Sequence, residues 1–193
     1  VGTQILAKGH DLPRLTLVAV VGVDEGLFSA DFRAGEKLAQ LLIQVAGRAG
    51  RAALPGEVLL QTHHPEHPLL QTLLAGGYPA VAALQLAERE AAQFPPFAPL
   101  ALLRAEATKE GDMQAFLQDA RACFPPGGDA WINGPMPAPM PRRAGKARGQ
   151  LLVGAPRRAP LHAVLDAWLP QLHDLPGARR VRWSLDVDPM DLY

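Results

Sequence analysis

The sequence predicts an α/β protein: a parallel sheet layer, then a helical connector, then an α+β domain with the element order βαββαβ. Two observations support this class. The apolar, largely β-branched run LTLVAVVGV at 15–23 is typical of a parallel strand buried on both faces. Further along, leucines recur at helical spacing, and later segments alternate apolar and polar residues as half-buried strands do. We therefore divide the chain into residues 1–66, 67–96 and 97–193.

The first segment is expected to run strand, helix, strand. After the strand at 15–23, a helix is predicted over 34–44, with an apolar stripe that ends before Gly47. The stripe consists of Leu38, Leu41, Leu42 and Val45. A second buried strand is predicted over 57–62, and the short connections favour an α/β sheet layer.

The connector is expected to be helical from 67 to 94, with one leucine stripe before Tyr78-Pro79 and a second after it. Consecutive prolines at 95 and 96 stop any helix, which sets the boundary near residue 96.

The last segment contains six predicted elements. Strands are expected at 100–107, 131–136, 150–155 and 180–187, and helices at 112–124 and 161–172. This order suggests a split βαβ arrangement with both helices on one sheet face. The Pro-Met stretch at 135–141 is interpreted as an extended loop. Trp131, Trp168 and Trp183 are expected in the core.

Composition narrows the function classes. Lys plus Arg and Asp plus Glu each number 19, so the distribution of charge is more informative than its total. No apolar run reaches the ~20 residues that span a bilayer, and we expect a cytoplasmic protein without a membrane partner. Cys123 is the only cysteine, which excludes a disulfide within the chain and a cysteine-based zinc site. The chain starts with Val1 inside a motif, so we expect a piece of a longer protein.

The strongest motif is QVAGRAGR at 44–51, a QxxGRxGR pattern. Two guanidiniums three residues apart, Arg48 and Arg51, can point into one cleft, while Gly47 lets the backbone approach a phosphate. Arginine binds phosphate oxygens through two parallel hydrogen bonds, and it stabilises the charge of a γ-phosphate in transfer. The plain alternative is a solvated helix end.

A second motif, GTQILAKGHDLP at 2–13, precedes the first strand. Such a loop lies at the sheet edge where α/β proteins usually bind ligands. Thr3 and nearby amides can hold a nucleic-acid phosphate, and Asp11 can accept a hydrogen bond from ribose or orient an arginine.

Together these segments resemble motifs V and VI of superfamily 2 helicases. The exact residues of these motifs resemble those of the PriA family of replication-restart helicases. The same resemblance extends to three further segments, DEGLFSADFRAGE at 24–36, LQTHHPEHPLL at 60–70 and the ending VRWSLDVDP. The AKGHDLP and DVDP segments argue against another superfamily 2 motor. The resemblance covers nearly the whole chain.

The resemblance implies the C-terminal part of a RecA-like helicase lobe, followed by the C-terminal domain of an ATP-driven, 3′-to-5′ DNA helicase that acts at stalled forks. It implies catalytic roles for Gln44, Arg48 and Arg51, and contacts to DNA from the loop around Thr3. The remaining expected contacts are Gly47, Asp11 and Lys8 for ATP, and Gly2 and Gln4 for DNA.

The phosphate loop and the DExH motif are absent from the sequence, so ATP and Mg²⁺ are expected to bind mainly to a missing first lobe. The chain alone should be inactive. The family's zinc ligands are also absent and are expected upstream. The alternative function is a non-enzymatic scaffold of the primosome that binds DNA and proteins.

Two further sites concern partners. A run without acidic residues between Asp129 and Asp166 contains Arg142, Arg143, Lys146 and Arg148, which are expected to bind forked or single-stranded DNA. The alternative is an ordinary solvated hairpin. By resemblance, Arg157 belongs to a pocket for the acidic tail of single-stranded DNA-binding protein, although Leu161 replaces the family's glutamine. Other primosome proteins are expected partners.

His63, His64 and His67 crowd together in HHPEH. Imidazoles are common zinc ligands, but the flanking prolines and the lack of a nearby cysteine favour a capped structural turn over a metal site.

Overall fold

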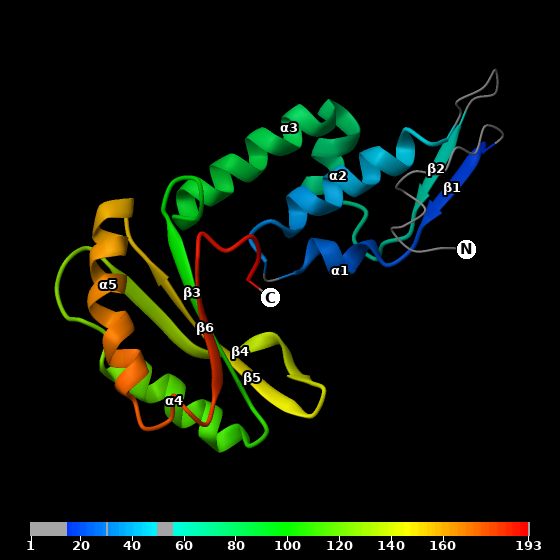
Figure 1. The fold of residues 1–193 in the computed structure, drawn as a ribbon. Helices are drawn as coiled ribbons and strands as arrows, with labels where there is room; N and C mark the ends of the chain where they lie inside the picture. The colour runs from blue at the N-terminus through cyan, green and yellow to red at the C-terminus, as the bar shows by residue number, and fades with distance from the viewer. Residues whose placement is uncertain (1–14, 30, 50–55, 193) are drawn as a thin grey trace. The chain divides into compact units, whose positions relative to one another are not determined.

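The computed structural model describes residues 15–29, 31–49 and 56–192. The chain packs as two compact units that divide between Glu88 and Arg89, and each has an apolar core of its own (Figure 1). The mixed α/β class is confirmed: one unit holds a two-stranded parallel sheet, and the other a four-stranded antiparallel sheet.

The sheet of the first unit consists of β1 (Leu17–Val20) and β2 (Glu57–Leu60), paired in parallel. Between them lie α1 (Val23–Leu27) and α2 (Ala34–Ala46), so the predicted strand, helix and strand are confirmed. The sequence did not predict α1, because Val23 continues the apolar run of β1. Gly22 turns the chain there with a φ of 71°, a conformation that suits glycine.

The expectation that β1 is buried on both faces is wrong for the described residues. Residues of β1 and β2 alternate between exposed and half-buried, with Leu17 50% and Leu59 49% exposed. Val20 and Leu60 pack against the core of the unit, so only the face that carries them is covered.

The core of the first unit joins α1 and α2 to α3 (Pro68–Ala92). Its buried members are Val23, Leu38, Ala39, Leu42, Leu69, Leu70 and Val81. Helix α3 is interrupted at Gly77, whose φ of 64° and ψ of −162° are not helical. Pro79 therefore lies at the start of the second half, where a proline costs no hydrogen bond.

Helix α3 is long and apolar enough to cross a membrane, judged by length and composition alone. The break at Gly77 divides it into two shorter helices, and Leu69 and Val81 are buried in the core of the unit. Most of the apolar window of α3 is not buried within the described structure.

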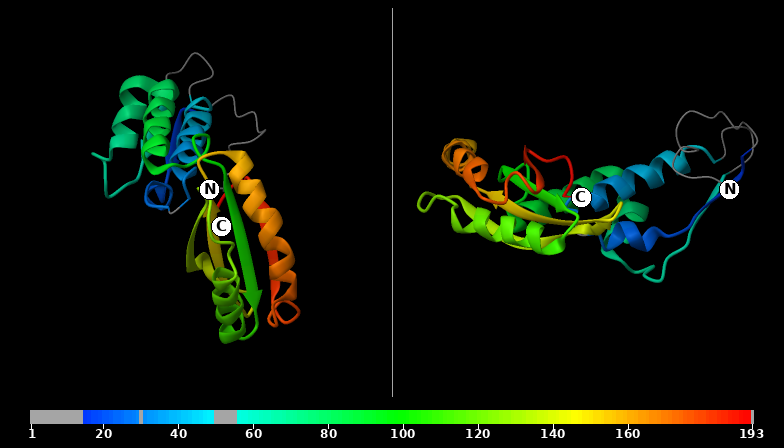
Figure 2. Two further views of the ribbon diagram at one scale, coloured as in Figure 1. Left: turned by 90° about the vertical axis from the view of Figure 1, so that its left-hand side faces the viewer. Right: turned by 60° about the horizontal axis from the view of Figure 1, so that its bottom comes forward.

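The second unit follows the predicted order of elements, β-α-β-β-α-β (Figures 1 and 2). The elements are β3 (Leu100–Ala107), α4 (Glu110–Ala122), β4 (Trp131–Arg143), β5 (Lys146–Gly154), α5 (Arg158–Asp174) and β6 (Arg182–Val187). The strands lie in the order β4-β5-β3-β6, with every neighbouring pair antiparallel. The edges of this sheet are therefore β4 and β6.

Both helices pack onto one face of this sheet. Alternate residues of β3, among them Ala101, Leu103 and Ala105, are buried together with residues of α4 and α5. Trp168 is fully buried, and its indole Nε1 donates a hydrogen bond of 2.9 Å to the carbonyl of Ala120. Of the three tryptophans expected in the core, only Trp168 is fully buried, whereas Trp131 and Trp183 are half-buried.

The Pro-Met stretch at 135–141 is not a loop, because strand β4 continues through it to Arg143. Proline has no backbone N–H, so it fits only where a strand needs no donor, as at a sheet edge. Strand β4 is an edge strand, and its register shifts twice in this stretch. The loop interpretation failed because the sequence does not show which strand lies at an edge.

Candidate nucleic-acid interface

The four basic residues predicted to bind DNA lie on a tight hairpin. Arg142 and Arg143 end β4, and Lys146 and Arg148 lie on β5, with Arg143 directly opposite Lys146. Ala144 and Gly145 form the turn, with φ values of 49° and 78°, as a two-residue hairpin turn requires. Strand β5 therefore begins at Lys146, four residues before the strand expected at 150–155. The strands fix these cations in place.

Neighbouring strands add more charge to the sheet face that the helices leave free. Glu106 of β3 lies opposite Arg148 of β5 and Arg182 of β6. The Glu106 carboxylate accepts a hydrogen bond of 3.0 Å from Lys146 Nζ and lies 3.6 Å from the Arg182 guanidinium. Residues opposite each other in antiparallel strands share a face, so these side chains form one group.

This group surrounds a pocket of about 460 Å³. Its charged lining consists of Arg104, Glu106, Arg143, Lys146, Arg148 and Arg182. The hydrogen bond from Lys146 is the main cause that lowers the pKa of Glu106, and the charges of Lys146, Arg182 and Arg148 add to it. Glu106 contacts both Lys146 and Arg182, and Asp186 and Asp191 hold Arg104. Five cations thus face three carboxylates, and the pocket keeps a net positive charge.

The cations differ in how they are held. Arg104 is fixed by Asp186 at 2.7 Å and by Asp191 at 3.6 Å, and Arg142 lies 2.9 Å from Glu110 of α4. Arg143, beside the turn, forms no ion pair with the residues that the structure describes. Its charge is available to an anion from solution.

Sequence reasoning found the hairpin residues but missed Arg104 and Arg182. They lie far along the chain from the hairpin and join it only through the pairing of β3 with β5 and β6. A usable signal was present in LLRAEA, where Arg104 and Glu106 alternate with the buried Leu103 and Ala105. Charges at this spacing indicate that one face of the strand is polar.

The nucleotide-binding residues expected in the first unit are described only in part. Gln44 is exposed on the last turn of α2, and Gly47 caps that helix by donating its N–H to the carbonyl of Ile43 at 2.9 Å. Arg48 follows, half-buried, and continues the turn. These three residues therefore lie together at the end of α2. The other expected residues, Gly2, Thr3, Gln4, Lys8, Asp11 and Arg51, lie outside the described residues.

The histidine-rich segment forms a turn clamped by Asp24 of α1. The Asp24 carboxylate accepts hydrogen bonds from Thr62 Oγ1 and from the His63 backbone N–H at 3.1 Å, and it lies 2.8 Å from His63 Nδ1. These bonds, the one from Thr62 first, lower the pKa of Asp24 to about 2. His67 Nδ1 accepts the backbone N–H of Leu69 and so caps the start of α3.

The remaining histidine, His64, makes an edge contact with the ring of Phe28 at 4.7 Å between centroids. Among residues 15–29, 31–49 and 56–192, no three His, Cys, Asp or Glu side chains lie close enough to hold a metal ion.

Arg157, expected to bind a partner, is exposed at the N-cap of α5. Leu161, where the resemblance led us to expect a glutamine, is fully buried in the core of the second unit. It therefore lines no surface pocket beside Arg157.

Comparison with known proteins gives one family and several relatives. Residues 90–190 match the family described as the primosomal protein N C-terminal domain. The chain is 50% identical to the replication restart protein PriA of Haemophilus influenzae over its whole length, which is 26% of that protein. It is 42% identical to the protein of the same name from Synechocystis, over 81% of this chain and 19% of that one. It is 34% identical to the protein of the same name from Bacillus subtilis, over 97% of this chain and 24% of that protein.

Proposed function

The chain belongs to the primosomal protein N, or PriA, family, and on this premise we propose that it is part of an ATP-dependent 3′-to-5′ DNA helicase. In this role it acts in the cytoplasm, in replication restart and primosome assembly at stalled forks. The segment shared with the relatives named replication restart protein is 26% of the Haemophilus protein and 19% of the Synechocystis protein, so we place the ATPase cycle in the longer protein.

The observation that carries the DNA part of this proposal is the basic pocket. Five cations from four strands line the pocket on a sheet face without helices, and they outnumber the three carboxylates that contact them, Glu106, Asp186 and Asp191. Such a surface binds the phosphate backbone with little regard to sequence, and it releases counterions when it does so. The pairing of β4 with β5 sets the spacing of Arg143 and Arg148 along the hairpin, and both would contact that backbone.

The motor part of the proposal rests on the end of α2. Gln44, Gly47 and Arg48 lie together there, and with Arg51 they would face a nucleotide that is bound, with Mg²⁺, mainly by another lobe. Leu17 and Leu59 are half exposed on one face of β1 and β2. This supports a further layer in the longer protein, because parallel sheets are normally covered on both faces. The loop that contains Gly2, Thr3, Gln4, Lys8 and Asp11 would couple the nucleotide state to DNA.

For partner binding we propose that Arg157 contacts the acidic tail of single-stranded DNA-binding protein. Its exposed position before α5 allows a guanidinium to pair with a carboxylate. Because Leu161 is buried, the contact in this protein would rest on Arg157 without the family's second polar residue.

The test of DNA binding replaces Arg143 and Arg148 with alanine and measures affinity for single-stranded DNA across a salt series. If each contacts one phosphate, the slope of log affinity against log salt becomes shallower by about 1.4 in total, because each lost contact contributes about 0.7. Forked DNA is compared in the same series.

The matched control removes two exposed arginines outside the pocket, Arg121 of α4 and Arg180. It is expected to leave the salt slope of the unmodified protein. Equal slopes for all three proteins would contradict the assignment of the hairpin to DNA.

A further inference from the structure

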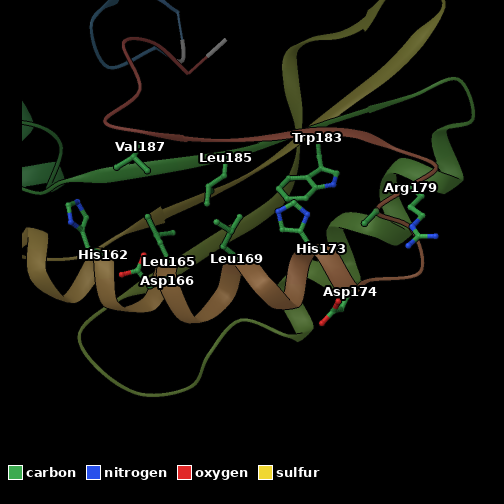
Figure 3. A pocket seen from close by; sticks show the side chains of 11 residues that line it. His162, Leu165, Asp166, Leu169, His173, Asp174, Arg179, Trp183, Leu185 and Val187 are labelled. Carbon is green, nitrogen blue, oxygen red and sulfur yellow. The ribbon is translucent and has the colours of Figure 1, made fainter.

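A groove on the second unit, unrelated to the basic pocket, runs between α5 and the edge strand β6 (Figure 3). It has a volume of about 1040 Å³. Leu165, Leu169 and His173 project from α5 toward β6, and Trp183, Leu185 and Val187 project from β6 toward α5. One wall of the groove is therefore a face of helix α5. The other wall is formed by the side chains of β6, a strand at the edge of the sheet.

The groove has an apolar centre between polar ends and is partly open to solvent. Leu169 is 38% and Val187 42% exposed, whereas Leu165 is buried at its floor. The ring of Trp183 stacks on Phe116 and meets the edge of His173 at 4.9 Å between centroids, which fixes it as a flat wall. An occupant that fills the groove would bury apolar surface on both walls.

The backbone of β6 offers hydrogen bonds along the same groove. Only one side of β6 is paired, with β3, so alternate N–H and C=O groups point away from the sheet. The sequence RWSLDV contains no proline, so every residue of β6 retains its donor. A strand added here would pair with β6 and direct every second side chain toward α5.

The charges at the groove favour one kind of side chain. At the end of the groove where Val187 lies, the α5 wall carries His162 and Asp166. Asp166 has no hydrogen-bond or ion-pair partner among the described residues. At the other end, Asp174 and Arg179 carry opposite charges and set no net preference. A basic residue is thus favoured near Val187, and apolar residues near Leu185 and Trp183.

We propose that this groove binds an extended segment of a partner protein, which adds to β6 as an antiparallel strand. Because β6 runs from Trp183 to Val187, the bound segment presents a basic residue first and then apolar residues at the second and fourth positions after it. The pairing direction follows from the more favourable hydrogen bonds of antiparallel strands. This proposal does not depend on DNA binding or ATPase activity.

The first experiment measures binding of the peptide TKTVTLTS to the protein by fluorescence anisotropy or NMR. The control peptide TETVTLTS differs only in the charge placed opposite Asp166. The lysine peptide is expected to bind about threefold to tenfold more tightly, the range for one exposed attractive pair compared with a repulsive one. Absence of saturable binding up to about 1 mM peptide would overturn the proposal.

The second experiment exchanges the charge on the protein. Asp166→Lys is expected to reverse the preference, so that the glutamate peptide binds more tightly. Asp119→Lys, a matched change at an exposed position of α4 outside the groove, is expected to keep the original preference. An unchanged preference in Asp166→Lys would refute the predicted register.

The third experiment distinguishes strand addition from simple apolar contact. Peptides methylated on the amide nitrogens of either alternate set of residues are compared, because only one set faces β6. One methylated peptide should lose binding and the other should retain it. Equal binding by both, or a dimer formed by the protein through β6 in sedimentation experiments, would contradict the proposal.

Discussion

At the scale of single residues, Asp24 connects two segments that are distant in the sequence. Its carboxylate holds the turn that leads into α3 through Thr62 and His63. The histidines around it therefore have contacts of their own: His63 with Asp24, His64 with Phe28, and His67 with the first turn of α3. A crowded set of imidazoles in a sequence can reflect the construction of a turn.

The variant Asp24→Asn is expected to destabilise the first unit near neutral pH. The folded-state pKa of Asp24, about 2, lies below its usual 3.8. The carboxylate therefore stabilises the fold fully above about pH 3.8, and this contribution is lost as the pH falls through about 2. The difference in urea midpoint between variant and parent should thus be large at pH 7 and vanish near pH 2. Asp119→Asn is the control, and equal midpoints at pH 7 would contradict the role of Asp24.

At the scale of elements, the sequence predicts a strand accurately when that strand is buried and regularly paired. The bounds of β3 are those expected, because LALLRAEA pairs an alternating pattern with burial at the centre of the sheet. Strand β4 is missed over its second half, because proline reads as a loop signal unless the strand is known to lie at an edge.

In the candidate site, too, the sequence predicts the local arrangement but not the pairing of distant strands. The basic residues of the hairpin are close in sequence, so their clustering was predicted. Arg104 and Arg182 join them only through the register of β3 with its two neighbours. The sequence alone does not specify such a register between distant strands.

The hairpin turn supplies a prediction at this scale. Gly145 has a φ of 78°, and a side chain there would meet no atom within 4 Å, so the cost of Gly145→Val is one of backbone conformation alone. The free energy of unfolding should fall by about 1–2 kcal/mol. Ala144→Gly, at the neighbouring φ of 49°, should be at least as stable as the parent. Urea unfolding measures both, and a neutral Gly145→Val would contradict the turn geometry.

At the scale of the whole molecule, the two units differ in how much of their apolar surface is buried. The second has a continuous core in which sheet and helices share buried residues, including Phe116, Leu151 and Trp168. The first exposes one apolar face of a two-stranded sheet. Its stability should depend more strongly on surfaces supplied by the longer protein.

We therefore expect residues 89–193 to fold when expressed alone. The measurement is urea unfolding followed by tryptophan fluorescence, since Trp168 is buried against Phe124 and bonded to Ala120. A single cooperative transition is expected. A broad, non-cooperative transition would show that the core of the second unit is insufficient.

The complete chain is expected to show no ATPase activity, with or without DNA, because the sequence contains no phosphate loop. Phosphate release in the presence of ATP, Mg²⁺ and single-stranded DNA measures this directly. Turnover by the chain alone would refute the proposed division of the motor between lobes. A longer protein that also lacks turnover would favour the scaffold alternative.

The two borders of the four-stranded sheet are chemically unequal. Proline occupies every second position from 135 to 141 along β4, whereas β6 has none. A hydrogen-bonded ladder can thus be extended on one side only. Once the β6 edge is occupied by an added strand, the sheet offers no second edge of this kind, so strand addition stops after one partner and does not grow into a fibre.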